Sequence, residues 1–243
     1  MTNSLIKSLQ TSGPRGRPLD SSVLRRLGIS SALAHDYVKS GWLVRLGRGV
    51  FMFAGDTLQR DSTLGFLESR MPGLHVAAKT ALAWHGYRQN VAQQEKLILW
   101  GTRKGSLPTW FTDRFQARYT SCKLFDDHLP AGFCLAPLLN SQNGPTVSTP
   151  ERALLEMLSE LDTHESLEET RNIMELVRQL RTKHLATLIK HCRMIKAVRL
   201  CVVWAEELGL PWAEAARQAV GSKNGNSRWV KRLKDGRTLI LNP

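Results

Sequence analysis

The chain has 243 residues, 42% of them hydrophobic, and its 34 Lys and Arg residues outnumber its 21 Asp and Glu residues to give a formal net charge of +13. This composition excludes a mainly disordered chain, and no run of about eighteen apolar residues is present to span a membrane. The basic excess implies an acidic partner. Because no amphipathic basic helix with bulky apolar residues stands out, we expect nucleic acid and not a membrane surface.

The length predicts two or three modest domains. Residues 1–10 lack the apolar core and the cleavage site of a secretory signal, and the cysteines are widely scattered along the chain. We therefore expect a cytoplasmic protein. Its cysteines are expected to be reduced and mostly buried: Cys122, Cys134, Cys192 and Cys201.

The first predicted element is a short helix over residues 4–10, and a basic loop follows it. The loop reads Gly-Pro-Arg-Gly-Arg-Pro over residues 13–18, which resembles the core of an AT-hook. Prolines extend the backbone and glycine lets it approach the floor of a narrow A·T minor groove, along which Arg15 and Arg17 would run. The alternative is an ordinary solvent-exposed loop rich in turn-forming residues.

Residues 20–41 carry the pattern of a helix-turn-helix. Asp20 or Ser21 can cap a helix that Gly28 ends, and Ser30 can cap the next helix, which stops at Ser-Gly. Two helices joined by a three-residue turn are typical of this motif, which places its last helix in the major groove of DNA.

The outward face of that last helix carries polar residues suited to base edges. Helical spacing turns Leu33 and Tyr37 inward, with Ala34 and Val38 beside them. Hydroxyl, imidazole and ammonium groups then face outward, where they can hydrogen-bond to bases. The predicted contact residues on this helix are Ser30, Ser31, His35 and Lys39.

Residues 42–53 predict a β-hairpin, and therefore a wing. Two apolar runs flank Gly-Arg-Gly at residues 47–49, a tip that exposes Arg48. Arg48 and Arg45 are predicted to reach phosphates or the neighbouring minor groove. A winged helix used for protein contact is the alternative. An RNA-binding module is disfavoured because the three tyrosines and the scattered tryptophans form no stacking platform.

The middle of the chain is predicted to be a small α+β domain. Its elements are a helix over 56–70, a strand over 74–77, a helix over 79–85, a strand over 96–101 and a further strand or pair over 115–125. His75 and His85 have no cluster of ligands at metal-binding spacing, so we expect buried or half-buried histidines. The Ser/Asn/Gly/Pro stretch over 140–150 is a candidate joint.

The C-terminal region is predicted to be mainly helical with a terminal hairpin. Thr-Pro-Glu at 149–151 is a strong helix start, with an N-cap, a proline at the first position and an acid facing the helix dipole. Further helices are predicted over 167–180, 185–192 and 198–208, and a hairpin over 229–241 that turns at Asp235-Gly236. The fold class is accordingly α+β, with a winged helix-turn-helix over 1–55, an α+β domain over 56–147 and a helical region over 148–243.

The charge changes sign along the C-terminal half. Residues 151–180 are rich in acids and are predicted to avoid phosphate, whereas basic residues return between Arg181 and Arg199 without an acid among them. This second basic stretch is either another contact surface or the solvated face of a helix.

Enzyme motifs are missing from the sequence. A nucleotidyltransferase needs Gly-Ser followed by paired acids, and no Asp-x-Asp follows Gly105-Ser106 or Gly221-Ser222. Glu95-Lys96 lacks the acids of a nuclease, and there is no P-loop, nucleophile elbow or zinc-ligand spacing. We expect no catalytic residue, no metal and no cofactor, and we predict a sequence-specific DNA-binding regulator.

Three segments together resemble the AbiEi family of antitoxins, the transcriptional-regulator half of type IV toxin–antitoxin pairs. They are residues 41–45 and 48–51, which close the winged helix, Ala-Ala-Lys-Thr-Ala-Leu-Ala-Trp-His-Gly at 77–86, and Ser-Thr-Pro-Glu-Arg-Ala-Leu-Leu-Glu at 148–156. Their order and spacing carry the resemblance.

The resemblance implies an N-terminal domain that binds inverted repeats in its own promoter and represses the pair. It also implies a C-terminal domain that counteracts a nucleotidyltransferase-like toxin without necessarily touching it. The AT-hook-like loop is not part of what the resemblance implies. A stand-alone regulator without a toxin partner and a non-catalytic protein-interaction module are the alternatives.

Overall fold

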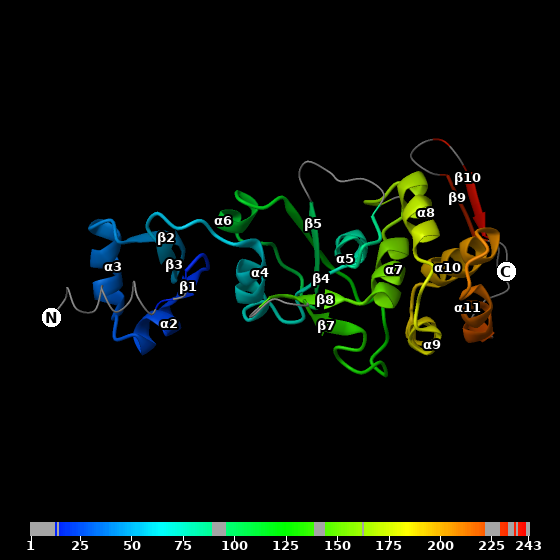
Figure 1. Cartoon of the computed structure of the whole chain (residues 1–243), viewed down its shortest axis with the longest axis horizontal. Coiled ribbons are helices and arrows are strands. Elements are labelled where there is room, and N and C mark those ends of the chain that lie inside the picture. Colours follow the sequence, from blue (N-terminus) through cyan, green and yellow to red (C-terminus); the bar gives the residue numbers. More distant parts are fainter. Residues whose placement is uncertain are drawn as a thin grey trace. The chain divides into compact units, whose positions relative to one another are not determined.

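A computed structural model describes residues 13, 15–88, 96–138, 144–161, 163–221, 229–232, 236 and 238–241 (Figure 1). The fold is α+β, as predicted. The chain divides into a first unit, Met1–Pro72 with Ser106–Phe115 and Leu138–Pro145, and a second unit, Gly73–Gly105 with Gln116–Pro137 and Thr146–Pro243. The domain limits predicted at residues 55 and 147 stay a prediction.

The first unit contains the predicted winged helix. Its three-stranded sheet has the order β1-β3-β2, and all pairs are antiparallel. Leu24, Tyr37 and Phe53 are among the residues that form its core. The elements are β1 (Leu19–Asp20), α2 (Ser21–Arg26), α3 (Ser31–Lys39), β2 (Leu43–Gly47) and β3 (Val50–Phe53).

Short polar side chains start both helices of this motif. The Asp20 carboxylate accepts a hydrogen bond of 2.7 Å from the backbone N–H of Val23. The Ser30 hydroxyl accepts one of 3.2 Å from the N–H of Leu33. Each satisfies an N–H group that the first turn of a helix leaves without a partner, so both predicted caps are confirmed.

Two further helices belong to the first unit, α4 (Arg60–Glu68) and α6 (Thr109–Thr112). Phe66 and Trp110 join them through an edge-to-face ring contact with centroids 6.3 Å apart. The apolar spacing of the sequence predicted α4 but not α6. Four residues are too short a window for helical periodicity, and they lie 41 positions beyond the end of α4.

A five-stranded mixed sheet with the order β6-β5-β4-β8-β7 forms the centre of the second unit. The short central strand β4 pairs antiparallel with β5 and parallel with β8, through Val76 opposite Val147. The strands are β4 (His75–Val76), β5 (Leu97–Gly101), β6 (Ala117–Ser121), β7 (Leu135–Pro137) and β8 (Thr146–Ser148).

Strand β8 lies inside the stretch over 140–150 that the sequence analysis took for a joint between domains. Its three residues, Thr-Val-Ser, show no usable alternation, and its partner in the sheet is distant in the sequence. Strand β7, also of three residues, was missed because it is too short to show alternation, and it pairs with β8 alone. Such strands are specified by the sheet they complete and not by their own pattern.

In its described residues, the second unit also contains six helices and the two strands of a hairpin. The predicted helix starts near 79, 150 and 167 are confirmed, while α8 ends four residues before its predicted limit, and α11 was not predicted. The helix predicted over 4–10 and the hairpin turn at Asp235 lie outside the described residues. The elements are α5 (Ala78–Trp84), α7 (Pro150–Ser159), α8 (Leu167–Leu176), α9 (Thr182–His191), α10 (Ile195–Glu207), α11 (Ala213–Val220), β9 (Trp229–Arg232) and β10 (Thr238–Leu241).

Helix α7 carries a fully buried carboxylate, Glu156, that joins several elements. It accepts hydrogen bonds from His75 Nε2 (3.2 Å), Ala78 N (3.1 Å), Ser148 Oγ (2.8 Å) and Arg152 Nε (2.8 Å). Burial by itself would raise the pKa of Glu156, but the contacts with His75 and Arg152 lower it to about 2. Glu156 is therefore a structural anion that ties α7 to β4, β8 and α5.

Other acids of the acid-rich stretch are also buried in ion pairs. Glu160 and Glu165 both bind Arg118, and Glu165 also binds Lys79 at 2.9 Å. Glu151 accepts from the backbone N–H and the guanidinium of Arg181. These carboxylates are therefore bound within the second unit, and the prediction that residues 151–180 avoid phosphate stays a prediction.

The basic stretch from Arg181 to Arg199 is likewise divided among structural contacts. Arg181 pairs with Glu151. Lys196 Nζ donates to the carbonyls of Ser159 and Leu161 at the end of α7, and Arg199 is buried. This stretch therefore does not form one continuous solvated helix face.

We predict that Glu156→Gln lowers the free energy of unfolding by about 3 kcal/mol at neutral pH, because it removes the anion that pairs with the partly buried Arg152 guanidinium. The stabilisation by the carboxylate is complete above its ordinary pKa of 4.5 and is lost as the pH falls towards the folded value of about 2. Urea unfolding between neutral and acid pH should show the two proteins converging. The control Glu175→Gln, at an exposed site on α8, should change the free energy of unfolding by less than about 0.5 kcal/mol. Equal stability of the two variants would contradict the role of Glu156 as a structural anion.

Candidate nucleic-acid interface

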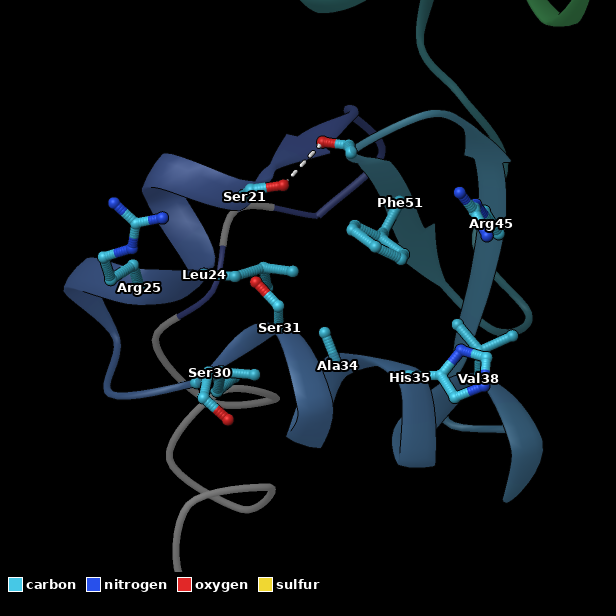
Figure 2. Close-up of a pocket in the computed structure, with 12 residues that line it drawn as sticks. Ser21, Leu24, Arg25, Ser30, Ser31, Ala34, His35, Val38, Arg45 and Phe51 are labelled. Carbon is cyan, nitrogen blue, oxygen red and sulfur yellow. Dashed lines mark hydrogen bonds between the residues drawn. The ribbon is translucent and has the colours of Figure 1, made fainter.

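A groove of about 240 Å³ lies between α2, α3 and the wing strands in the first unit (Figure 2). Its apolar lining comes from Leu24, Ile29, Ala34, Val38 and Phe51. None of its lining residues is acidic. Its polar lining residues are Ser21, Arg25, Ser30, Ser31, His35 and Arg45.

Helix α3 presents the side chains that its periodicity predicts. Ala34 and Tyr37 are buried, while Ser31, His35 and Lys39 are exposed. The spacing of four residues between these three exposed side chains places them along one strip of the helix. The structure brings Ser30, Ser31 and His35 to the groove together, and Lys39 lies one turn beyond His35.

Arg25 is a groove residue that the sequence analysis did not assign. It is exposed in the last turn of α2 and lines the same groove as His35 and Arg45. The buried position of Leu24 is the signal that could have identified it, because the next residue on a helix then points away from the core.

The wing is fastened to the start of α2. The backbone N–H and the hydroxyl of Ser21 both donate to the carbonyl of Gly49, at 3.1 Å and 3.2 Å; Figure 2 marks the second bond. Gly49 has a φ of +69°, which side-chain-bearing residues rarely adopt. The neighbouring Arg48 is exposed at the tip, and Arg45 Nε donates to the carbonyl of Gly47 at 3.4 Å.

The AT-hook-like loop is folded onto its own unit. Asp56 forms an ion pair with Arg15 and accepts a hydrogen bond of 3.0 Å from Gly16 N, and the Arg15 guanidinium lies 4.8 Å from the centre of the Phe53 ring. The carbonyl of Gly16 accepts a bond of 2.6 Å from Gln59 N. Arg17 is half-buried, and its Nε makes no hydrogen bond to any residue that the structure describes.

Outside this unit, the structure gives the histidines and cysteines structural positions. His75 is buried, as predicted, and contacts Glu156. The same prediction was wrong for His85, which is exposed with Nε2 3.0 Å from the carbonyl of Ser148. Among the described residues, no group of three His, Cys or acidic side chains is placed to hold a metal, and no helix is long and apolar enough to cross a membrane.

All four cysteines are free thiols. Cys122 is half-exposed and the others are buried.

Two family models together account for nearly the whole chain. Residues 2–93 match the N-terminal domain of the AbiEi antitoxin transcriptional regulators. Residues 94–240 match the transcriptional regulator described as the AbiEi antitoxin of type IV TA systems. The chain belongs to the AbiEi antitoxin family. It therefore carries the domains of a regulatory antitoxin, and the family is described as a transcriptional regulator and not as a class of enzymes.

A solved structure shares the fold. The crystal structure of the RV2827C protein from Mycobacterium tuberculosis superposes with a TM-score of 0.61, over 90% of this chain and 80% of that one, at 15% sequence identity. This identity supports a common fold alone. A search of curated proteins found no match.

We predict that Gly49→Ala destabilises the protein more than Gly55→Ala. Both positions have positive φ, at +69° and +79°, so both variants should lose about 1 kcal/mol to backbone strain. A Cβ on Gly49 would also lie 3.0 Å from Ser21 Oγ, whereas one on Gly55 meets nothing within 4 Å. Displacing the Ser21 hydroxyl should cost about 1 kcal/mol more in thermal or urea unfolding. Equal losses would mean that the hydrogen bond from the Ser21 hydroxyl to the carbonyl of Gly49 adds no stability.

Proposed function

We propose that this chain is a sequence-specific DNA-binding repressor of its own promoter, acting as the antitoxin of a type IV toxin–antitoxin pair. The observation that carries the proposal is the groove on the winged helix of the first unit, which has no acidic lining residue. Its polar lining includes Ser31, His35, Arg45 and Arg25. Membership of a family of transcriptional regulators supports a nucleic-acid partner.

The arrangement suits duplex DNA through the two elements that border the groove. In a winged helix, α3 enters the major groove and the wing reaches the adjacent minor groove, so the sugar–phosphate strand between the two grooves passes between helix and wing. Arg45 and Arg25 are positioned to bind phosphate there, while the apolar lining can contact deoxyribose. Ser30, Ser31, His35 and Lys39 then meet base edges.

Arg48 has a different proposed role from that of α3. It is exposed at the tip of the wing, directly after β2, the strand that carries Arg45. The hydrogen bonds from Ser21 to the carbonyl of Gly49 fix the turn that presents it. A cation at this place contacts phosphates or the minor groove, which presents few sequence-dependent groups. We assign it to affinity and not to base preference.

We assign the antitoxin activity to the second unit. Membership of a family of type IV antitoxins supports a toxin partner. We propose that this partner is a nucleotidyltransferase-like toxin, and the proposal requires no direct contact between the two proteins. The proposal includes promoter inverted repeats as the operator.

The first test is a gel-shift titration of the full chain on its own upstream region and on a scrambled duplex, at two salt concentrations. The proposal expects preferential binding to the upstream region that survives the higher salt, because base contacts add to the salt-sensitive phosphate term. Equal binding to both duplexes that is lost at high salt would reject a sequence-specific regulator.

The same assay separates base-reading from phosphate-binding residues. His35→Ala should lower discrimination between the two duplexes by about 1–3 kcal/mol, because it removes a base contact. Arg48→Ala should weaken binding to both alike and lower the slope of log affinity against log salt by about 1. Arg178→Ala, an exposed arginine of the second unit, controls for the lost charge. A uniform loss of affinity in both His35→Ala and Arg48→Ala would refute this division of roles.

We keep Arg15 and Arg17 as proposed minor-groove residues and predict that the double change to Ala weakens binding most on A·T-rich duplexes. Because Arg15 also pairs with Asp56, loss of the loop's structure is a competing cause. Asp56→Ala is the matched control, since it breaks the same ion pair and leaves both arginines in place. An equal loss on G·C-rich duplexes, or the same loss in Asp56→Ala, would exclude minor-groove recognition by this loop.

A further inference from the structure

Three carboxylates lie between residues 15 and 59, and two of them have clear structural roles. Asp20 caps α2 and forms an ion pair of 3.2 Å with Arg70, and Asp56 holds the loop through Arg15 and Gly16. Each is close to a cation and to a backbone N–H. Both charges are therefore compensated within the first unit.

Asp36 is different. It is exposed on α3, next to His35 and one turn from Ala32, and its carboxylate makes no hydrogen bond or ion pair with any residue in the described part of the chain. It also lies in the second half of the helix, where a negative charge interacts unfavourably with the helix dipole. Among the described residues, no contact stabilises this charge.

A carboxylate on a helix that approaches DNA carries a cost, because it repels the phosphates. The cost is offset only where a base donates a hydrogen bond to the carboxylate. In the major groove, cytosine offers its N4 amino group, whereas guanine and thymine present acceptors to the same region. Adenine offers N6 beside the acceptor N7, which favours an amide over a carboxylate.

We propose that Asp36 is a specificity-determining residue that accepts a hydrogen bond from the N4 amino group of a cytosine in the operator. The inference rests on the proposed function, because it requires α3 in the major groove. Asp36 selects in two ways: it gains affinity from cytosine, and its charge opposes the acceptor groups of guanine and thymine. It acts beside His35 but on a different base.

The inference predicts a change of preferred base and not only a loss of binding. Asparagine has the shape of aspartate but offers a donor and an acceptor, the pair that matches adenine N6 and N7. Asp36→Asn should therefore move the preference at one operator position from cytosine to adenine. Asp36→Ala should remove the preference at that position.

The test is selection of binding sites from a random duplex library by the full wild-type chain, Asp36→Asn, Asp36→Ala and Asp113→Asn, followed by sequencing. Asp113 is an exposed acid at the end of α6 in the same unit, so its variant controls for the lost charge. At one position we expect wild type and Asp113→Asn to favour cytosine by about tenfold, and Asp36→Asn to favour adenine. Preferences at the other positions should be retained.

The outcomes separate this inference from the function on which it rests. If wild type enriches a defined site and both Asp36 variants enrich the same site unchanged, Asp36 is a solvated acid and the inference is overturned while the proposed function stands. If wild type enriches no sequence, the proposed function fails and the inference fails with it. A switch in Asp36→Asn that is absent from Asp113→Asn supports both.

Discussion

The second unit depends on the requirement that a buried carboxylate be fully hydrogen-bonded. Glu156 has no exposed surface and meets donors from four segments, including the backbone N–H of Ala78 and the hydroxyl of Ser148. These bonds fix where α7 starts relative to the central strands, because moving any one segment would leave a charge or an N–H without a partner. Glu160 and Glu151 extend the same constraint along α7 through Arg118 and Arg181. Much of the charge in this half of the chain therefore holds the unit together.

The first unit uses its acids in a related way, with a different consequence. Asp20 and Asp56 bind Arg70 and Arg15 inside the unit, so their negative charge is cancelled locally. The arginines around the groove, by contrast, have no acid among the lining residues. The groove between α2, α3 and β2 therefore carries the positive charge of Arg25 and Arg45, which no lining acid cancels. Asp36 is the exception, because its carboxylate makes no hydrogen bond or ion pair with the residues that the structure describes.

Several features of this protein were accessible from the sequence because they depend on neighbours in the chain. The caps at Asp20 and Ser30, the strip of Ser31, His35 and Lys39, and the wing with its glycine-rich tip all follow from helical or strand periodicity and turn chemistry. The family followed from the order of three segments. Strands β7 and β8 and helix α6 were not accessible in this way, because each is too short to show a period. Strand β8 also pairs with β4, which is distant in the sequence.

The sequence by itself determined the α+β class, the winged helix and the side chains that α3 turns outward, since these need only local backbone preferences and the separation of apolar from polar residues. Only the tertiary structure decided which charges are available to a partner. The sequence shows Arg15, Arg181 and Lys196 as equal cations, yet each is bound to oxygen atoms of its own unit, while Arg25 joins His35 and Arg45 at the groove. The physical reason is that a charge is cancelled or left free by groups close in space, and those groups are distant in the sequence.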